Sequence, residues 1–241
     1  MTVWVLVGVA ATVGLAAGAQ QLVGFGFSLM AMPLLTAMLG PQDAVALAAV
    51  ASLAGGSTMA WRLRDRTDRR VLRRLVVGAL PGLPLGVLAL AHLPDAPLRI
   101  AVAGAVLVMV VILAVGYEVA DERPATEVGA GFVAGALGTS IGISGPPVVL
   151  VLQAARMEQH RFRATTVAFF TVCNVATLPL LLGTGVADLD RWPAALVAVP
   201  AALVGNRACE DLAHRVPPAR FRPLVLALLV VVAGVALATA A

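Results

Sequence analysis

The sequence has no lysine, only two cysteines and few charged residues of either sign. Charged residues make up 12% of the 241 residues and aromatic residues 5%, whereas 60% are hydrophobic and the mean hydropathy is +0.95. A chain with so little charge cannot cover the surface of a water-soluble globule. The composition therefore predicts an integral membrane protein.

Several kinds of site are also missing. Cys173 and Cys209 fall within or at the end of apolar segments, which fits reduced thiols better than a disulfide framework. The histidines stand apart from other metal-ligating side chains, so we expect no metal site and no cofactor. The sequence has no nucleotide-binding loop, no nucleophile motif and no acid within an apolar segment, so we expect no catalytic residues.

Six apolar segments of 17 to 20 residues are long enough to cross a bilayer as helices. All 17 basic residues are arginines, and the densest cluster lies between two of these segments, at residues 62–74. A short cytoplasmic loop that faces anionic lipid explains such a cluster, so we expect no nucleic acid partner. The six segments are 44–61, 75–91, 98–117, 164–182, 192–209 and 223–240.

The two halves of the chain carry the same order of segments. Residues 24–26 align with residues 142–144 at an offset of 118, and an offset of 119 later pairs Pro81 with Pro200. Each match is weak by itself, because glycine and proline are common in membrane helices; the shared order carries the argument. We predict a first repeat at 1–117, a connecting loop at 118–127 and a second repeat at 128–241.

Each half opens with 28 largely apolar residues, 10–37 and 128–155, that glycine, serine and proline interrupt. As a helix such a stretch would measure about 42 Å, too long for one crossing of a core of about 30 Å and too short for two. A re-entrant hairpin of two half-helices fits this length. A single tilted or kinked crossing is the alternative that length alone leaves open.

The arginines favour the hairpins. If both stretches return to the side from which they came, 15 of the 17 arginines fall on one side of the membrane; if both cross, the split is nine against eight. A hairpin plus three spans makes an odd number of crossings, so the second half would start on the opposite side. We therefore predict an all-α polytopic membrane protein of two inverted repeats, each a re-entrant or broken helical hairpin plus three transmembrane helices.

Each break would leave the first backbone N–H groups of a half-helix without partners. Residues 144–146 are typical of a helix start, with Ser144 as the N-cap and proline in the first turn, and residues 26–28 form a weaker start. Two such starts that meet near the midplane would each bring about half a positive charge, which favours an anion. Close helix packing is the alternative role of Gly24 and Gly26.

The span after each break supplies polar side chains. Thr166, Cys173 and Thr177 share one helix face with Asn174 beside it, and Ser52 lies in the related stretch of the first half. Such residues also serve as hydrogen-bonding partners between helices. The candidate anion-binding residues are Gly24, Gly26, Phe27, Ser28, Ser52, Gly142, Ser144, Gly145, Pro146, Thr166 and Asn174.

These residues carry a resemblance to a known family. The pattern GFGFSxxxxPLL at 24–35, the second glycine-rich break at 142–147, the basic loop and the repeat resemble the TauE/SafE family of sulfite exporters over nearly the whole chain. The resemblance implies export or exchange of sulfite, sulfoacetate or other organosulfonates across the bacterial inner membrane. The family usually has three consecutive glycines at each break, whereas here Phe27 follows Gly26 and residues 144–146 are Ser-Gly-Pro.

We therefore expect a secondary transporter of a small anion that resides in the lipid bilayer of the inner membrane. An anion channel with the same site, a membrane enzyme and a membrane-embedded subunit of a larger complex are the alternatives. The sequence leaves open whether the chain forms a homodimer, which anion it carries and which ion it couples.

Overall fold

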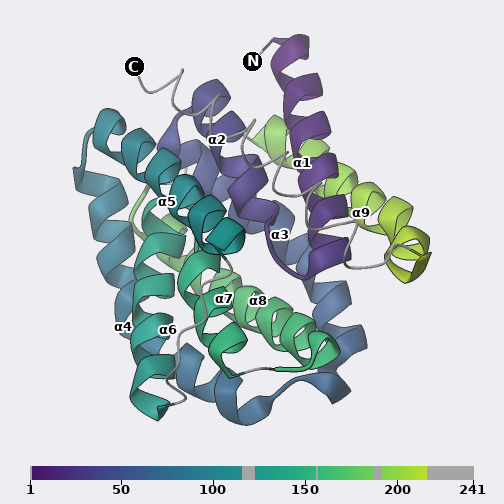
Figure 1. The fold of residues 1–241 in the computed structure, drawn as a ribbon. Helices are drawn as coiled ribbons and strands as arrows, with labels where there is room; N and C mark the ends of the chain where they lie inside the picture. Colours follow the sequence, from purple (N-terminus) through teal and green to yellow (C-terminus); the bar gives the residue numbers. More distant parts are fainter. Residues whose placement is uncertain (1, 116–122, 156, 187–191, 216–241) are drawn as a thin grey trace.

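A computed structural model describes residues 2–115, 123–155, 157–186 and 192–215 (Figure 1). Within these ranges the chain is helical and contains no strand, which confirms the prediction of an all-α protein. The helices α1, α3, α4 and α8 are each long and apolar enough to cross a bilayer. The protein is therefore a polytopic membrane protein.

The described part of the first half, residues 2–115, contains five α-helices. The side chain of Asp68 caps α4 by accepting hydrogen bonds from the backbone N–H groups of Arg70 and Val71, and Pro41 stands in the first turn of α3. The helices are α1 (Val3–Val23), α2 (Phe27–Leu39), α3 (Pro41–Leu63), α4 (Arg69–His92) and α5 (Asp95–Val115), with a short 3₁₀ turn, η1 (Arg64–Arg66), between α3 and α4.

The described part of the second half contains α6 (Pro124–Ser140), α7 (Gly145–Ala154), α8 (Gln159–Gly183) and α9 (Trp192–Arg215). Four predicted segments, 44–61, 75–91, 164–182 and 192–209, fall inside α3, α4, α8 and α9. The segment 98–117 falls in α5 as far as residue 115, and the segment 223–240 lies outside the described residues.

The helix before the first break is longer than predicted. We expected residues 10–37 to form two half-helices, but α1 has 21 residues, a length of about 32 Å, and only α2, with 13 residues, is short. The expectation was wrong because residues 3–9 are also apolar and extend the first arm. In the second half the arms have 17 and 10 residues.

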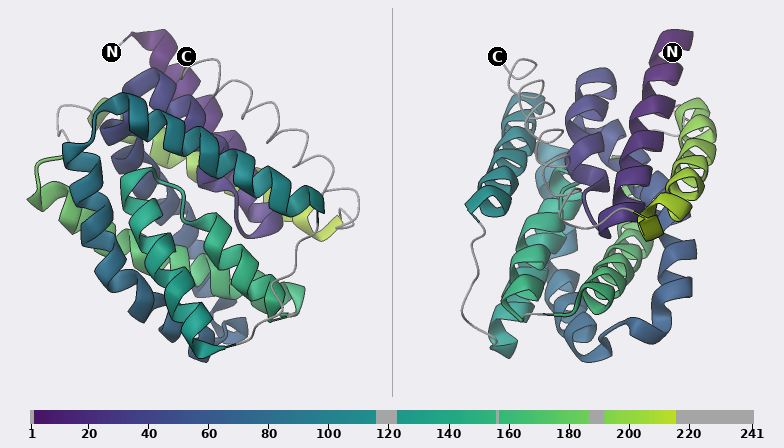
Figure 2. Two further views of the ribbon diagram at one scale, coloured as in Figure 1. Left: turned by 60° about the vertical axis from the view of Figure 1, so that its left-hand side comes forward. Right: turned by 45° about the vertical axis from the view of Figure 1, so that its right-hand side comes forward.

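Both breaks fall where the sequence predicted them. Gly24 and Gly26 adopt left-handed backbone angles, with φ of +90° and +99°, and these angles turn the chain back on itself. Figures 1 and 2 show α2 returning toward the end of the molecule at which the N-terminus lies, whereas α7 runs toward the opposite end. The two short helices therefore start in the interior and point away from each other.

Among the helix pairs that join the halves, α1 packs along α9 and α4 packs along α6 (Figure 2). Their backbones touch: a Cβ atom added to Gly82 would lie 2.2 Å from the carbonyl oxygen of Phe132, and one added to Gly205 would lie 2.1 Å from that of Gly14. Glycine permits this approach, as it does in many membrane helix pairs.

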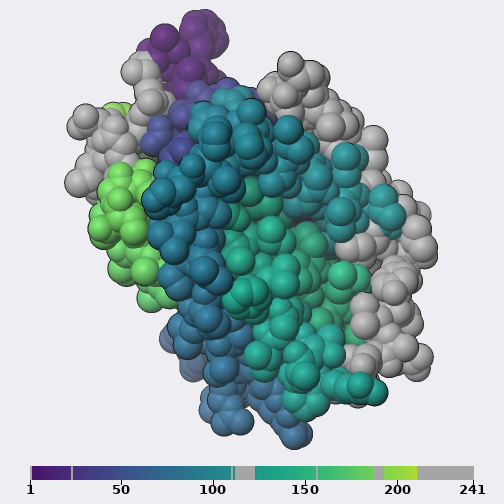
Figure 3. All heavy atoms as spheres, turned by 90° about the vertical axis from the view of Figure 1, so that its left-hand side faces the viewer, coloured from purple at the N-terminus to yellow at the C-terminus, as the bar shows by residue number. Residues whose placement is uncertain are grey.

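Figure 3 shows the face on which α4, α5 and α6 lie next to one another. Large apolar side chains on these three helices are exposed, as expected for a surface in contact with lipid tails rather than water. Among them are Val77, Leu80, Leu85, Ile100, Val108, Val111, Phe132 and Val133.

Candidate functional site

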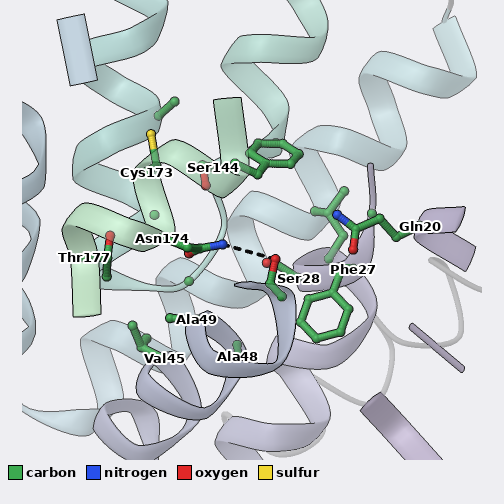
Figure 4. Close-up of a pocket in the computed structure, with 18 of the residues that line it drawn as sticks. Gln20, Phe27, Ser28, Val45, Ala48, Ala49, Ser144, Cys173, Asn174 and Thr177 are labelled. Carbon is green, nitrogen blue, oxygen red and sulfur yellow. Dashed lines mark hydrogen bonds between the residues drawn. The ribbon is translucent and has the colours of Figure 1, made fainter. Parts of the chain in front are cut away.

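A cavity of about 30 Å³ lies where the two breaks meet and is partly open to its surroundings (Figure 4). The start of α2, the start of α7 and the middles of α3 and α8 all contribute to its wall. Its apolar wall includes Phe27, Leu29, Val45, Leu83 and Phe170, and its polar side chains are Gln20, Ser28, Ser52, Ser144, Cys173, Asn174 and Thr177.

The start of α2 offers free backbone donors to this cavity. Gly26 occupies the N-cap position, no side chain caps the helix, and the first N–H to bond along the helix is that of Met30, at 3.1 Å from the Gly26 carbonyl oxygen. The N–H groups of residues 27–29 therefore have no acceptor among the described residues. They can donate to a ligand.

The start of α7 is built differently. A serine at the N-cap normally accepts a hydrogen bond from the second or third residue of the helix, but in α7 these are Pro146 and Pro147, which have no N–H. Ser144 occupies the N-cap position, as predicted, but its side chain makes no capping hydrogen bond. Its hydroxyl lies at the cavity instead (Figure 4), and Gly145 supplies the free N–H of this first turn.

None of the described residues that line the cavity carries a charge at neutral pH. The positive potential in the cavity therefore comes from two helix N-termini, each equivalent to about half an elementary charge. Hydroxyl and amide groups add neutral donors. This combination suits a small anion and needs no buried arginine.

Asn174 and Ser52 join the two halves at the cavity. The side-chain amide of Asn174, on α8, donates a hydrogen bond of 3.1 Å to the hydroxyl oxygen of Ser52, on α3 (Figure 4). Since the Ser52 oxygen accepts this bond, its own hydrogen is free to point to a ligand. Donation by the amide also strengthens the hydroxyl as a donor.

The structure brings most of the predicted residues together. Eight of the eleven line the cavity: Gly26, Phe27, Ser28, Ser52, Gly142, Ser144, Gly145 and Asn174. Pro146 is buried in the first turn of α7 and does not line the cavity. Thr166 is fully buried nearer the start of α8, where its hydroxyl donates to the Phe162 carbonyl oxygen at 2.8 Å.

Gly24 and Gly26 have different roles in the structure. A Cβ atom at Gly24 would lie 2.6 Å from the Cγ atom of Arg163, so Gly24 packs against α8 and lies outside the cavity wall. A Cβ atom at Gly26 would meet no atom within 4 Å, because the cavity lies in front of it. The packing alternative therefore holds for Gly24.

Sequence reasoning missed two residues near the break. Gln20, in the last turn of α1, is 4% exposed and lines the cavity. Arg163, near the start of α8, donates a hydrogen bond to the Gln21 carbonyl oxygen and places its positive charge at the negative end of α1. The position of Gln20, six residues before Gly26 in an apolar run, was the available signal.

Three ion pairs between residues that the structure describes join the halves at the arginine-rich end of the molecule. Arg74 pairs with the buried Glu127 at 3.0 Å, and Arg161 pairs with Asp68 at 2.8 Å. Arg62 also pairs with Glu210. In each pair one partner lies before residue 117 and the other after it.

Comparison with known proteins places the sequence in a transporter family. The family model for the sulfite exporter TauE/SafE matches residues 9–236. A Cupriavidus necator protein named probable sulfite/organosulfonate exporter TauE is 28% identical over 222 residues, which cover 88% of this chain and 84% of that protein. A Comamonas testosteroni protein named probable inner membrane transporter protein TsaS is 32% identical over 113 residues, 45% of each chain.

No solved structure matches the chain. The family match nevertheless covers nearly all of the sequence, including both broken helices and the cavity between them. The chain therefore belongs to the sulfite exporter TauE/SafE family of membrane transporters.

Proposed function

We propose that this chain is a secondary transporter that exports or exchanges small sulfur-containing anions, such as sulfite, sulfoacetate or other organosulfonates, across the bacterial inner membrane. The observation that carries this proposal is the cavity, in which two helix N-termini and neutral donors face a space without charged side chains. The name of the Cupriavidus necator relative supports sulfite and organosulfonates as the substrate class.

The transporter would consist of two inverted repeats, 1–117 and 128–241, joined by the loop 118–127. Reciprocal helix packing supports this division. If α1 to α4 correspond to α6 to α9, then the contact of α1 with α9 and the contact of α4 with α6 are the same contact made twice. The opposite directions of α2 and α7 support inversion of the second repeat (Figure 1).

In this proposal the anion exchanges its water shell for the free N–H groups of α2 and the hydroxyls and amides around it. Alternating access then arises as one half rocks against the other around the cavity. The ion pairs between the halves would have to separate when the cavity opens toward the arginine-rich end.

Counter-flow in liposomes tests this function. Purified protein is reconstituted into vesicles loaded with unlabelled sulfite, and uptake of external ³⁵S-sulfite is followed under nitrogen, which limits oxidation to sulfate. We expect saturable uptake that internal sulfite or methanesulfonate accelerates. Uptake that neither saturates nor responds to internal anion would indicate a channel, and no uptake of any sulfur oxyanion would contradict the proposal.

A further inference from the structure

We infer that Arg163 forms a second anion site, outside the cavity, which the transported anion occupies on its way between the cavity and the arginine-rich end of the molecule. This inference rests on the proposed function and deepens it. Arg163 lies about one turn inside α8, two residues after Arg161, whose partner Asp68 is at the arginine-rich end. It packs against Gly24, which stands two residues before Gly26 in the cavity wall. The side chain therefore lies between that end and the cavity.

The guanidinium of Arg163 has an unused donor. Its Nη2 atom donates a hydrogen bond to the Gln21 carbonyl oxygen, whereas its Nε atom is buried and has no hydrogen-bond partner in the part of the chain that the structure describes. Nε and Nη2 lie on the same edge of the guanidinium, and this edge can bind two oxygens of one oxyanion. Because a buried donor without an acceptor is costly, an oxyanion at this edge would satisfy a group that the protein leaves unpaired.

The charges around Arg163 are also unequal. The charge of Glu210, on α9, acts on Arg163, but the carboxylate of Glu210 already pairs with Arg62. One negative charge therefore faces two positive charges. Since Arg163 is partly buried, its charge is costly to leave without a partner. An anion beside Arg163 would supply the missing negative charge.

An aromatic pair lies beside this site. The rings of Phe25, in the first break, and Phe162, next to Arg163 on α8, meet edge to face with their centroids 6.1 Å apart. Neither ring lines the cavity. The ring contact and the bond from Arg163 to Gln21 both join the break of the first half to the start of α8 in the second half. If the halves rock apart at this end, these contacts separate and the guanidinium edge becomes accessible to the anion.

An arginine on the path suits the proposed substrates. Sulfoacetate carries a sulfonate and a carboxylate, and the removal of two negative charges from water is costly. The described residues that line the cavity are neutral, so Arg163 offers a full positive charge just before the anion reaches them. A doubly charged anion should therefore depend on Arg163 more strongly than a singly charged one.

Uptake of radiolabelled sulfoacetate and methanesulfonate into membrane vesicles tests the inference. Everted vesicles expose the arginine-rich end, which the positive-inside rule places in the cytoplasm, and right-side-out vesicles expose the opposite end. In everted vesicles Arg163→Met should raise the half-saturation concentration for sulfoacetate at least about tenfold, because a charge-assisted hydrogen bond is lost, and that for methanesulfonate less. In right-side-out vesicles both values should stay within about twofold of wild type.

Arg161→Met is the matched control, because it removes the same charge two residues earlier, from an exposed side chain; its half-saturation concentrations should equal those of wild type. If Arg163→Met does not fold, Arg163→Lys keeps the charge without the two-donor edge and should show a rise of about threefold in everted vesicles alone. Unchanged values in the Arg163 variants, or an equal rise from both sides, would overturn the inference. Wild-type vesicles that take up neither anion would instead refute the proposed function.

Discussion

At the scale of single residues, the two helix starts at the cavity both provide hydrogen-bond donors, but from different groups. The start of α2 keeps three N–H groups free because the glycine before it has no side chain to cap them. The start of α7 has two prolines without N–H groups, so the Ser144 hydroxyl accepts no capping hydrogen bond and remains at the cavity. The sequence was sufficient to locate both starts. It did not reveal that Thr166 bonds to its own helix or that Gly24 packs on Arg163, because these depend on how α8 is rotated.

Gly145 allows a cleaner test of the cavity than Gly26. Any side chain at Gly26 would be strained by its φ of +99°, whereas a Cβ atom at Gly145 would make an ordinary contact, 3.9 Å from the Cδ1 atom of Leu29. We expect Gly145→Ala to keep sulfite uptake within about threefold of wild type. Gly145→Leu should abolish uptake without lowering the melting temperature, since its side chain fills the cavity; normal uptake by this variant would argue that the anion passes elsewhere.

At the scale of helices, the apolar pattern predicted where segments occur better than how they end. The spans that became α3, α4 and α8 could be recognised from length and hydropathy alone. The length of α1 could not be recognised in the same way. An apolar run does not show whether it forms a full span or a half-helix unless a capping residue or a break marks where the helix starts. The pairing of α1 with α9 and of α4 with α6 could not be predicted either, since glycine spacing identifies the face of a helix that packs closely but not the helix it packs against.

The pairing of α4 with α6 predicts opposite effects for two glycines in α6. A Cβ atom at Gly131 would lie 2.0 Å from the Leu75 carbonyl oxygen, so Gly131→Ala must push the helices apart and should cost about 1–3 kcal/mol. Gly129→Ala meets no atom within 4 Å and should stabilise the helix by up to about 1 kcal/mol. Melting temperatures in detergent measure both, and a similar change in the two variants would contradict the close packing.

At the scale of the whole molecule, the charged residues in the described part of the chain lie toward the ends of the helices, and the cavity between the halves is lined by neutral residues. Composition alone predicted the membrane class, and the arginine count favoured hairpins over crossings. The arginine counts could not reveal that Arg62, Arg74 and Arg161 pair with acids of the opposite half. The counts say on which side of the membrane an arginine lies, but not which acidic residue it pairs with. These pairs and the glycine contacts hold the halves around the cavity.

The central claim is that a neutral cavity between two helix starts binds a small anion. The most direct test measures the Kd for sulfite of the purified wild-type protein and of its Asn174→Ala and Asn174→Asp variants. The Kd of the wild-type protein for a cationic solute is the control. We predict a Kd about tenfold weaker for Asn174→Ala, which loses one donor, and no binding by Asn174→Asp, which adds a negative charge where water screens it poorly. Equal and small effects of the two substitutions, or tighter binding of the cation by wild type, would contradict the account.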